Sequence, residues 1–177
     1  ADHTVADAGG REALALNVQA QRSLLARLGA DERVLGTAIL STCGRTEVYL
    51  SLRMGTAADP FELAGWGERG HYTLAGEECF RHLALLGSGA LSQIFGEDQI
   101  LAQIKRAAAL ARECRAADSV TEVLFREATA SAKRMKTRCA LPHGSADAAR
   151  AALEVLRGKD GIRRVLVIGS GEIGRMA

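Results

Sequence analysis

Apolar and polar positions show two different periodicities over the first half of the chain. Between residues 11 and 28 the apolar side chains recur at helical spacing, and Gly29 is a natural end for the helix that this pattern predicts. Two runs of small, apolar and β-branched residues, 34–41 and 46–52, predict strands joined by a short polar turn. A third short strand is expected at residues 72–74.

Helical spacing dominates the middle of the chain. A short helix is predicted over residues 60–66, with Asp59 as its N-cap and proline at its first position. Longer helices are predicted over 77–86, 97–117 and 119–137, and the first residue of the last one is its expected cap. The inward side of that last helix is expected to hold Val120, Leu124, Ala128 and Met135.

The last part of the chain predicts a different kind of unit. A helix is expected over residues 146–156 and a buried strand over 164–168, which runs directly into a G-x-G-x-x-G turn. In a dinucleotide-binding unit such glycines allow a tight turn and a close approach of the backbone to a pyrophosphate. The expected cofactor-binding residues are Gly169, Ser170, Gly171, Glu172, Ile173 and Gly174.

These patterns together predict an α+β fold with two domains. The first domain is expected over residues 1–144, as a small mixed sheet with helices over 1–74 and a helical subdomain over 75–144. Residues 145–177 are expected to form a linker helix and the truncated beginning of a Rossmann α/β domain. Since that domain needs several more strands, we expect the sequence to be a piece of a longer protein.

Composition places the chain among ordinary water-soluble globular proteins. Of its 177 residues, 47% are hydrophobic and 25% are charged, and the net charge is +2. This charge does not by itself indicate a nucleic-acid-binding protein, although local basic patches remain compatible with one. Aromatic residues make up only 4%, which argues against a stacking platform for single-stranded bases.

The cysteines indicate a reducing compartment. They are widely spaced and form no C-x-x-C pair, so neither a zinc knuckle nor a disulfide framework is predicted. Cys79 lies one helical turn before His82, but no further ligands are suggested, and we expect no metal site. With no signal peptide, transit peptide or long apolar span in the sequence, we expect a cytoplasmic protein without membrane contact.

The polar turn between the two predicted strands is the main candidate for chemistry. Cys43 lies in that turn, two residues before the guanidinium of Arg45. A fixed positive charge favours the thiolate form of a neighbouring thiol, and the thiolate is the nucleophile. The alternative is a buried structural cysteine in a hairpin, because free cysteine often serves as a small core residue.

Three stretches in this order resemble the glutamyl-tRNA reductase family. They are S-T-C-G-R-T-E-V-Y at 41–49, then His82 followed by G-E-D-Q-I-L-A-Q-I-K at 96–105, and the glycine-rich turn at 169–174. The basic residues at 133–137 are also similar to a stretch of that family. The resemblance covers nearly the whole chain. It implies reduction of glutamyl-tRNA(Glu) to glutamate-1-semialdehyde, the first step of the five-carbon route to tetrapyrroles.

The resemblance also implies a role for each matching residue. Cys43 would attack the glutamyl ester and carry a thioester, and His82 would serve proton transfer or support the thiolate. Arg45 would hold the carboxylate of the glutamyl group through its planar fork. We expect Cys43, Arg45 and His82 to converge on one cleft. The further substrate-binding positions are Thr42, Gly44, Ser92, Glu97, Asp98, Gln99 and Gln103.

Cofactor and partners follow from the same resemblance. NADPH is the implied hydride donor, and glutamyl-tRNA(Glu) is the implied substrate. The full-length protein is expected to be a homodimer through a C-terminal domain outside this sequence, with glutamate-1-semialdehyde aminomutase as a further partner. The fragment itself is expected to support at most thioester formation or ester hydrolysis.

Several residues depart from the family pattern. Gly44 stands where asparagine is usual beside the nucleophile, and Leu91, Asp98, Arg138 and Cys139 replace a usual aspartate, proline, glutamate and threonine. Two other functions therefore stay open: a non-catalytic paralogue that binds tRNA or a partner, and an enzyme that acts on another aminoacyl-tRNA or acyl ester.

Residue-level alternatives also stay open. His82 could be a satisfied core histidine, and Gln99 with Gln103 an ordinary solvated helix face. The basic residues of 133–138 could contact tRNA phosphates or simply form a solvated charged surface.

Overall fold

The computed structural model describes residues 8–56, 58–66, 72–92, 95–139 and 154–158. Its centre is an antiparallel hairpin of β1 (Val34–Ser41) and β2 (Thr46–Leu52). Both strands have the predicted bounds. Ser41 pairs with Thr46 next to the turn, and a register shift near Gly36 marks the opposite end.

The sheet differs from the prediction in composition. Among the described residues it has two strands, both antiparallel, so the predicted mixed sheet is wrong for this part of the chain. The expected third strand at residues 72–74 has no regular secondary structure. So short a run gains few ladder hydrogen bonds, and side-chain contacts decide its path. The ring of Tyr72 packs edge-on against His82, with 6.1 Å between ring centroids.

The single helix predicted over residues 11–28 is two helices, α1 (Ala8–Leu14) and α2 (Val18–Gly29). The break arises because Asn17 caps α2, its side chain accepting a hydrogen bond from the amide of Ala20. The amide of Leu16 donates to Oγ of Ser41 at 2.9 Å. The break therefore ties the N-terminal helices to the end of β1, beside the hairpin turn.

Helix α3 (Pro60–Ala64) begins as predicted, with Asp59 as N-cap and proline in its first turn. It ends two residues earlier than predicted because Gly65 adopts the left-handed conformation, with φ of 73°. Helix α4 (Glu77–Gly87) matches its predicted range within one residue.

Helix α5 (Gln99–Glu113) is shorter at both ends than the predicted 97–117. At its start, Gly96 has a φ of 83°, Glu97 forms a β-bridge and Asp98 lies in a bend. At its end, Arg115 takes a positive φ of 54°, which is incompatible with a continuing helix. Both corrections come from backbone conformations that apolar periodicity does not report.

Helix α6 (Ser119–Arg138) has the predicted length, but its cap is Asp118 rather than Ser119. The Asp118 carboxylate accepts a hydrogen bond from the amide of Thr121. The Thr121 hydroxyl in turn accepts one from the amide of Asp118, which completes a capping box. Val120 was expected to face inward, yet it is 59% exposed. In the first turn the inward position is taken by Thr121 instead, which is buried.

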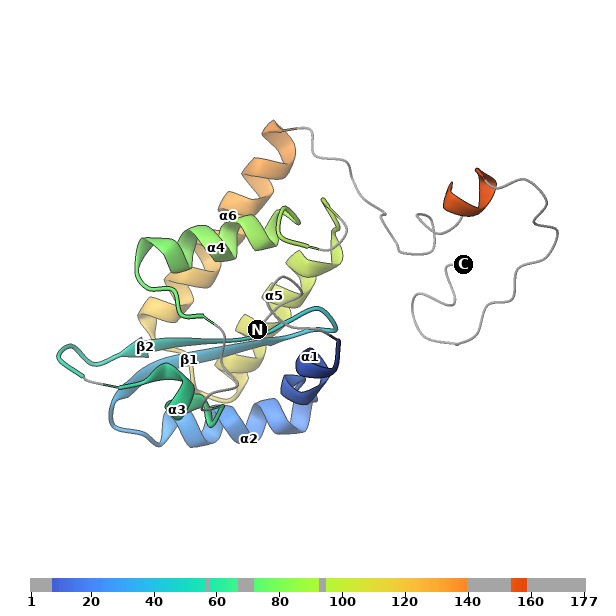
Figure 1. Ribbon diagram of the computed structural model, residues 1–177. Coiled ribbons are helices and arrows are strands. Elements are labelled where there is room, and N and C mark those ends of the chain that lie inside the picture. The colour runs from blue at the N-terminus through green and yellow to red at the C-terminus, as the bar shows by residue number, and fades with distance from the viewer. Residues whose placement is uncertain (1–7, 57, 67–71, 93–94, 140–153, 159–177) are drawn as a thin grey trace.

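The hairpin lies between two groups of helices (Figure 1). Helices α4, α5 and α6 pack on one side with Ala38, Leu40 and Tyr49, while α2 and α3 pack on the other side with Ile39. Alternate residues of β1 thus enter two different core clusters, which explains why the strand is almost continuously buried. The outer edge of β1 is covered where the amide of Thr37 donates to the carbonyl of Ala116 at 2.8 Å.

The C-terminal predictions lie mostly outside the described residues. Of the helix predicted over 146–156, residues 154–156 are described, and they are helical together with residue 157. The strand at 164–168, the turn at 169–174 and the proposed second domain lie outside the described residues. Within the described part of the chain, no helix combines the length and apolarity needed to cross a membrane.

Candidate active site

The thiol of Cys43 is exposed in the turn between β1 and β2. Thr42 closes this turn, because its amide donates to the carbonyl of Arg45 at 2.8 Å and its hydroxyl accepts from the amide of Gly44 at 3.2 Å. The reading of Cys43 as a buried structural cysteine is therefore wrong. The turn holds a thiol in contact with solvent on a backbone fixed by hydrogen bonds.

The backbone of Gly44 is not in the left-handed region, and the space around it is open. A Cβ added at this position would have the hydroxyl of Thr42, 4.0 Å away, as its nearest neighbour. The glycine is consequently not required by the backbone of the turn, and an asparagine would fit there.

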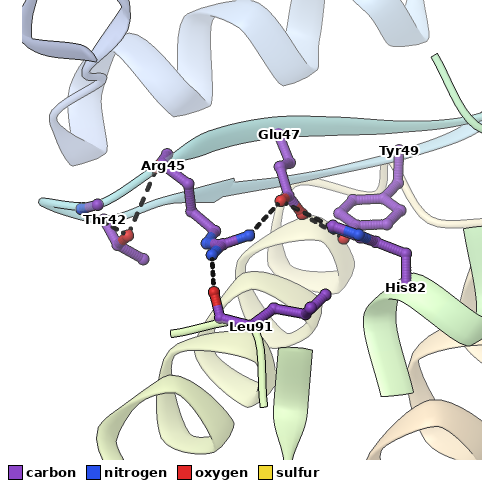
Figure 2. A network of polar contacts seen from close by, with 7 residues as sticks. Thr42, Arg45, Glu47, Tyr49, His82 and Leu91 are labelled. Atoms are coloured by element: carbon purple, nitrogen blue, oxygen red, sulfur yellow. Dashed lines mark hydrogen bonds and ion pairs between the residues drawn. The ribbon is translucent and has the colours of Figure 1, made fainter. Parts of the chain in front are cut away.

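Arg45, at the other end of the turn, is only 3% exposed. Its guanidinium donates to Oε1 of Glu47 at 3.0 Å and to the carbonyl of Leu91 at 2.5 Å (Figure 2). The second contact ties the hairpin to the loop between α4 and α5. Because Leu91 contributes its carbonyl, this contact does not depend on the identity of its side chain.

Glu47 is the centre of the polar network drawn in Figure 2. Its Oε1 also lies 2.9 Å from Nε2 of His82, and its Oε2 accepts from the hydroxyl of Tyr49 at 2.5 Å. Burial by itself raises the pKa of Glu47, but the hydrogen bond and charge of His82, with Tyr49 and Arg45, outweigh it and lower the pKa below its ordinary value. Glu47 is therefore an ionised carboxylate shared by two basic side chains.

The pKa values of two neighbours of Glu47, Tyr49 and Cys79, are shifted upward. Burial, and then the charge of Glu47, raise the pKa of Tyr49 well above its ordinary value, so its hydroxyl stays protonated as a donor. Burial, followed by Glu47, also raises the pKa of the Cys79 thiol. Cys79 is thus a neutral thiol, unlike a reactive one.

The loop between α4 and α5 closes on itself through two glycines with a φ of 83°, Gly89 and Gly96. The amide of Gly96 donates to the carbonyl of Gly89 at 3.0 Å. A Cβ on Gly89 would lie 2.8 Å from the backbone amide of Glu97, so only glycine fits this approach. Ser92 and Glu97 are half-buried members of this loop.

Lys136, from the last turn of α6, fastens the end of this loop. Its ammonium donates to the carbonyls of Gly96 and Glu97, each at 3.1 Å, and contacts the carboxylate of Asp98. The Lys136 side chain is only 10% exposed. It is therefore committed to the loop and does not belong to a free basic surface.

The remaining predicted substrate residues follow from this arrangement. Gln99 is exposed at the first position of α5, and Gln103 is half-buried one turn later. Through Arg45 and Leu91 the structure joins the hairpin to the loop that holds Ser92, Glu97 and Asp98. Cys43 stands apart from the network, exposed in the turn.

A cavity of about 320 Å³ lies beside β2. Glu47, Tyr49, His82 and Cys79 contribute to its wall, while Cys43 and Arg45 are not among its described lining residues. His82 and Arg45 meet through Glu47 rather than through the cavity. The predicted convergence of Cys43, Arg45 and His82 on one cleft stays a prediction. Across the described residues, no group of three His, Cys, Asp or Glu side chains is arranged to hold a metal ion.

Two residues of this site were missed at the level of sequence, Glu47 and Lys136. Glu47 could have been found, since residues 45, 47 and 49 point to the same face of a strand and place a carboxylate between a guanidinium and a phenol. Lys136 was predicted as part of a basic run. No sequence signal distinguishes it from its exposed neighbours.

Comparison with known proteins identifies the family. Residues 1–139 match the family model described as glutamyl-tRNA(Glu) reductase, N-terminal domain. The glutamyl-tRNA reductase of Acetivibrio thermocellus is 40% identical over 183 residues, covering 99% of this chain and 55% of that protein. That of Alkaliphilus oremlandii is 38% identical over 185 residues, with the same coverage of 99% and 55%.

A solved structure has the same fold. Glutamyl-tRNA reductase from Methanopyrus kandleri superimposes with a TM-score of 0.68 at 29% identity, over 99% of this chain and 43% of that one. The chain spans about half the length of the curated relatives named above. The chain therefore belongs to the glutamyl-tRNA reductase family, and residues 1–139 correspond to the N-terminal domain of that family.

Proposed function

We propose that this chain carries the thioester-forming site of a glutamyl-tRNA reductase. The observation that carries the proposal is the exposed thiol of Cys43, held in a hydrogen-bonded turn within a chain of this family. Sγ attacks the carbonyl carbon of the glutamyl ester, so that an S–C bond forms. The ester C–O bond then breaks, and the terminal ribose oxygen of the tRNA takes up a proton.

His82 is the proposed group for proton transfer. Because the ionised Glu47 accepts at Oε1, Nε2 of His82 carries a hydrogen, and Nδ1 is the ring nitrogen left to exchange a proton with the substrate. Glu47 thereby selects one tautomer of His82 and holds its ring in place. Its role is that of a positioning residue, since it acts through His82 and Arg45.

The proposed substrate contacts lie in the turn, the loop and the start of α5. Arg45 is proposed to hold the glutamyl carboxylate, which would compete with Glu47 for the guanidinium. The contact of Arg45 with Leu91 would then orient the loop at the same time. The other proposed contacts are Thr42, Gly44, Ser92, Glu97, Asp98, Gln99 and Gln103.

The proposed product is glutamate-1-semialdehyde, with glutamyl-tRNA(Glu) as substrate. NADPH would supply the hydride that reduces the acyl group. Its proposed contacts, Gly169 to Gly174, lie outside the described residues, so the steps derived above are limited to the formation of the thioester.

The test is acylation of Cys43 by tRNA(Glu) charged with labelled glutamate. The label is expected on Cys43, detected by intact mass and by peptide mapping at acid pH, and it should disappear in Cys43→Ser. Cys139→Ser is the matched control, because Cys139 is also an exposed free thiol and should not affect labelling. Binding of the tRNA without any acylation would support a binding paralogue instead. Equal labelling by tRNA charged with another amino acid would support the broader acyl-transfer function.

A further inference from the structure

A groove runs between α5 and α6, and we refer to it as the α5–α6 groove (Figure 1 shows the two helices). It has a volume of about 360 Å³. Lys105 and Arg112 line it from α5, and Arg126 and Lys133 line it from α6. Small residues form most of the remaining wall. Among the described residues that line the groove there is no acidic side chain.

The two helices run antiparallel, which orders these four charges. At one end Lys136 of α6 contacts Asp98 before α5, and at the other end Arg112 of α5 bonds Glu122 of α6. These contacts place Lys133 level with about residue 101 of α5 and Arg126 level with about residue 108, so that cations from the two helices alternate along the groove. With a rise of 1.5 Å per residue, successive cations are about 5 to 6 Å apart along the helix axis.

All four cationic groups are available to a ligand. Arg112 and Arg126 are 54% and 65% exposed, and their partners are the surface carboxylates of Glu122 and Glu127. Ion pairs at such exposure are weak and exchange readily. Lys105 and Lys133 are exposed and form no ion pair with any described residue. Of the four, only Arg112 takes part in a described contact between α5 and α6, through Glu122.

The groove ends level with the first turns of α5. Lys133 lies beside about residue 101, between the levels of Gln99 and Gln103, which are two proposed substrate contacts. At about 100° per residue, these glutamines leave α5 on a different face from Lys105. An extended polyanion in the groove would therefore reach the level of the candidate site at the start of α5. Cations that recur about every 5 to 6 Å suit a nucleic-acid backbone, which carries many regularly spaced phosphates, better than they suit a single phosphate.

We infer that the α5–α6 groove binds the sugar-phosphate backbone of the tRNA whose 3′ end enters the candidate active site. The inference rests on the proposed function for the choice of tRNA as ligand. It replaces the basic run at 133–138 as the tRNA contact, because Lys136 is committed to the loop and only Lys133 of that run lines the groove.

The experiment measures binding of uncharged, fluorescently labelled tRNA(Glu) by anisotropy at several salt concentrations. The double variant Lys105→Gln with Lys133→Gln keeps good helix formers and removes two charges. Its Kd is expected to rise about tenfold near 0.1 M salt, and its salt slope to fall by about 2. The control double variant, Arg53→Gln with Arg81→Gln, removes two exposed charges elsewhere and should change neither value. Thermal melts verify that both variants are folded.

An unchanged Kd and salt slope in the groove variant would overturn the inference, and so would equally tight binding of poly-glutamate. A second measurement separates this from the proposed function: acylation of Cys43 by a glutamate α-thiobenzyl ester, which contains no nucleic acid. The groove variant should be acylated by this ester at the same rate as the unaltered chain. If no variant is acylated, the proposed function fails, while the binding data still decide the role of the groove.

Discussion

Nε2 of His82 lies 2.9 Å from Oε1 of Glu47, and the same carboxylate oxygen accepts from Arg45 at 3.0 Å. One buried oxygen thus fixes the only histidine among the proposed site residues and the proposed substrate-carboxylate ligand. A buried charge shared in this way is costly to remove, because its partners are left without compensation. Glu47 therefore affects both the stability of the protein and the geometry of the candidate site.

The first prediction concerns the charge of Glu47. Glu47→Gln should lower the free energy of unfolding by about 3 kcal/mol, since it leaves the buried guanidinium of Arg45 without its counter-charge. It should also slow acylation of Cys43, because His82 loses the contact that fixes its tautomer. Urea unfolding and the acylation rate measure the two effects. Glu77→Gln breaks an exposed pair with Arg81 and should produce neither.

The pH dependence of stability should report the same carboxylate. The pKa of Glu47 is lower in the folded protein than its ordinary value of 4.5. The stabilisation is therefore fully present above about pH 4.5 and is lost as the pH falls through the lower folded pKa. Unfolding free energies measured from pH 6 to pH 3 should fall more steeply for the unaltered chain than for Glu47→Gln. Parallel curves would contradict the prediction.

Local sequence signals predicted the elements better than the site. The two strands were found at their bounds because β-branched runs and a polar turn mark a hairpin directly. The break at Asn17 and the cap at Asp118 were missed, because both depend on which side chain reaches a backbone amide after folding. Arg45 was predicted to hold the substrate carboxylate, but its bond to the carbonyl of Leu91 joins residues 46 positions apart, which no local pattern reports.

Lys136 provides the next prediction, as the residue that positions the loop before α5. Lys136→Met removes the donor to two carbonyls and should lower stability by about 2 kcal/mol. Hydrogen exchange of the amides at 96–99 should become faster, and the KM for glutamyl-tRNA should rise more than kcat falls. Arg134→Met is the matched control on the same helix, since this exposed residue bonds only Ser131 among the described contacts.

Gly36 gives a prediction about stability alone. A Cβ at this position would lie 2.2 Å from Oδ1 and 2.7 Å from the amide of Asp118, the residue that caps α6. Gly36→Ala must therefore displace the cap and should cost about 3 kcal/mol. Gly29→Ala has no neighbour within 4 Å and should be neutral or slightly stabilising. Thermal melts compare the two, and equal effects would show that the cap moves aside freely.

The last prediction concerns the turn that holds Cys43, the proposed nucleophile. Gly44→Asn should leave the melting temperature unchanged, because the position is open and its φ is accessible to any residue. The added amide would stand beside Cys43, where the resemblance to the family implies an asparagine. One further hydrogen bond to the reacting ester is worth about 1 kcal/mol, so acylation should accelerate about fivefold. Gly44→Ala, which adds bulk without a donor, separates the hydrogen bond from a stiffer backbone. An equal acceleration in both variants would assign the gain to the backbone and contradict a contact between the amide and the substrate.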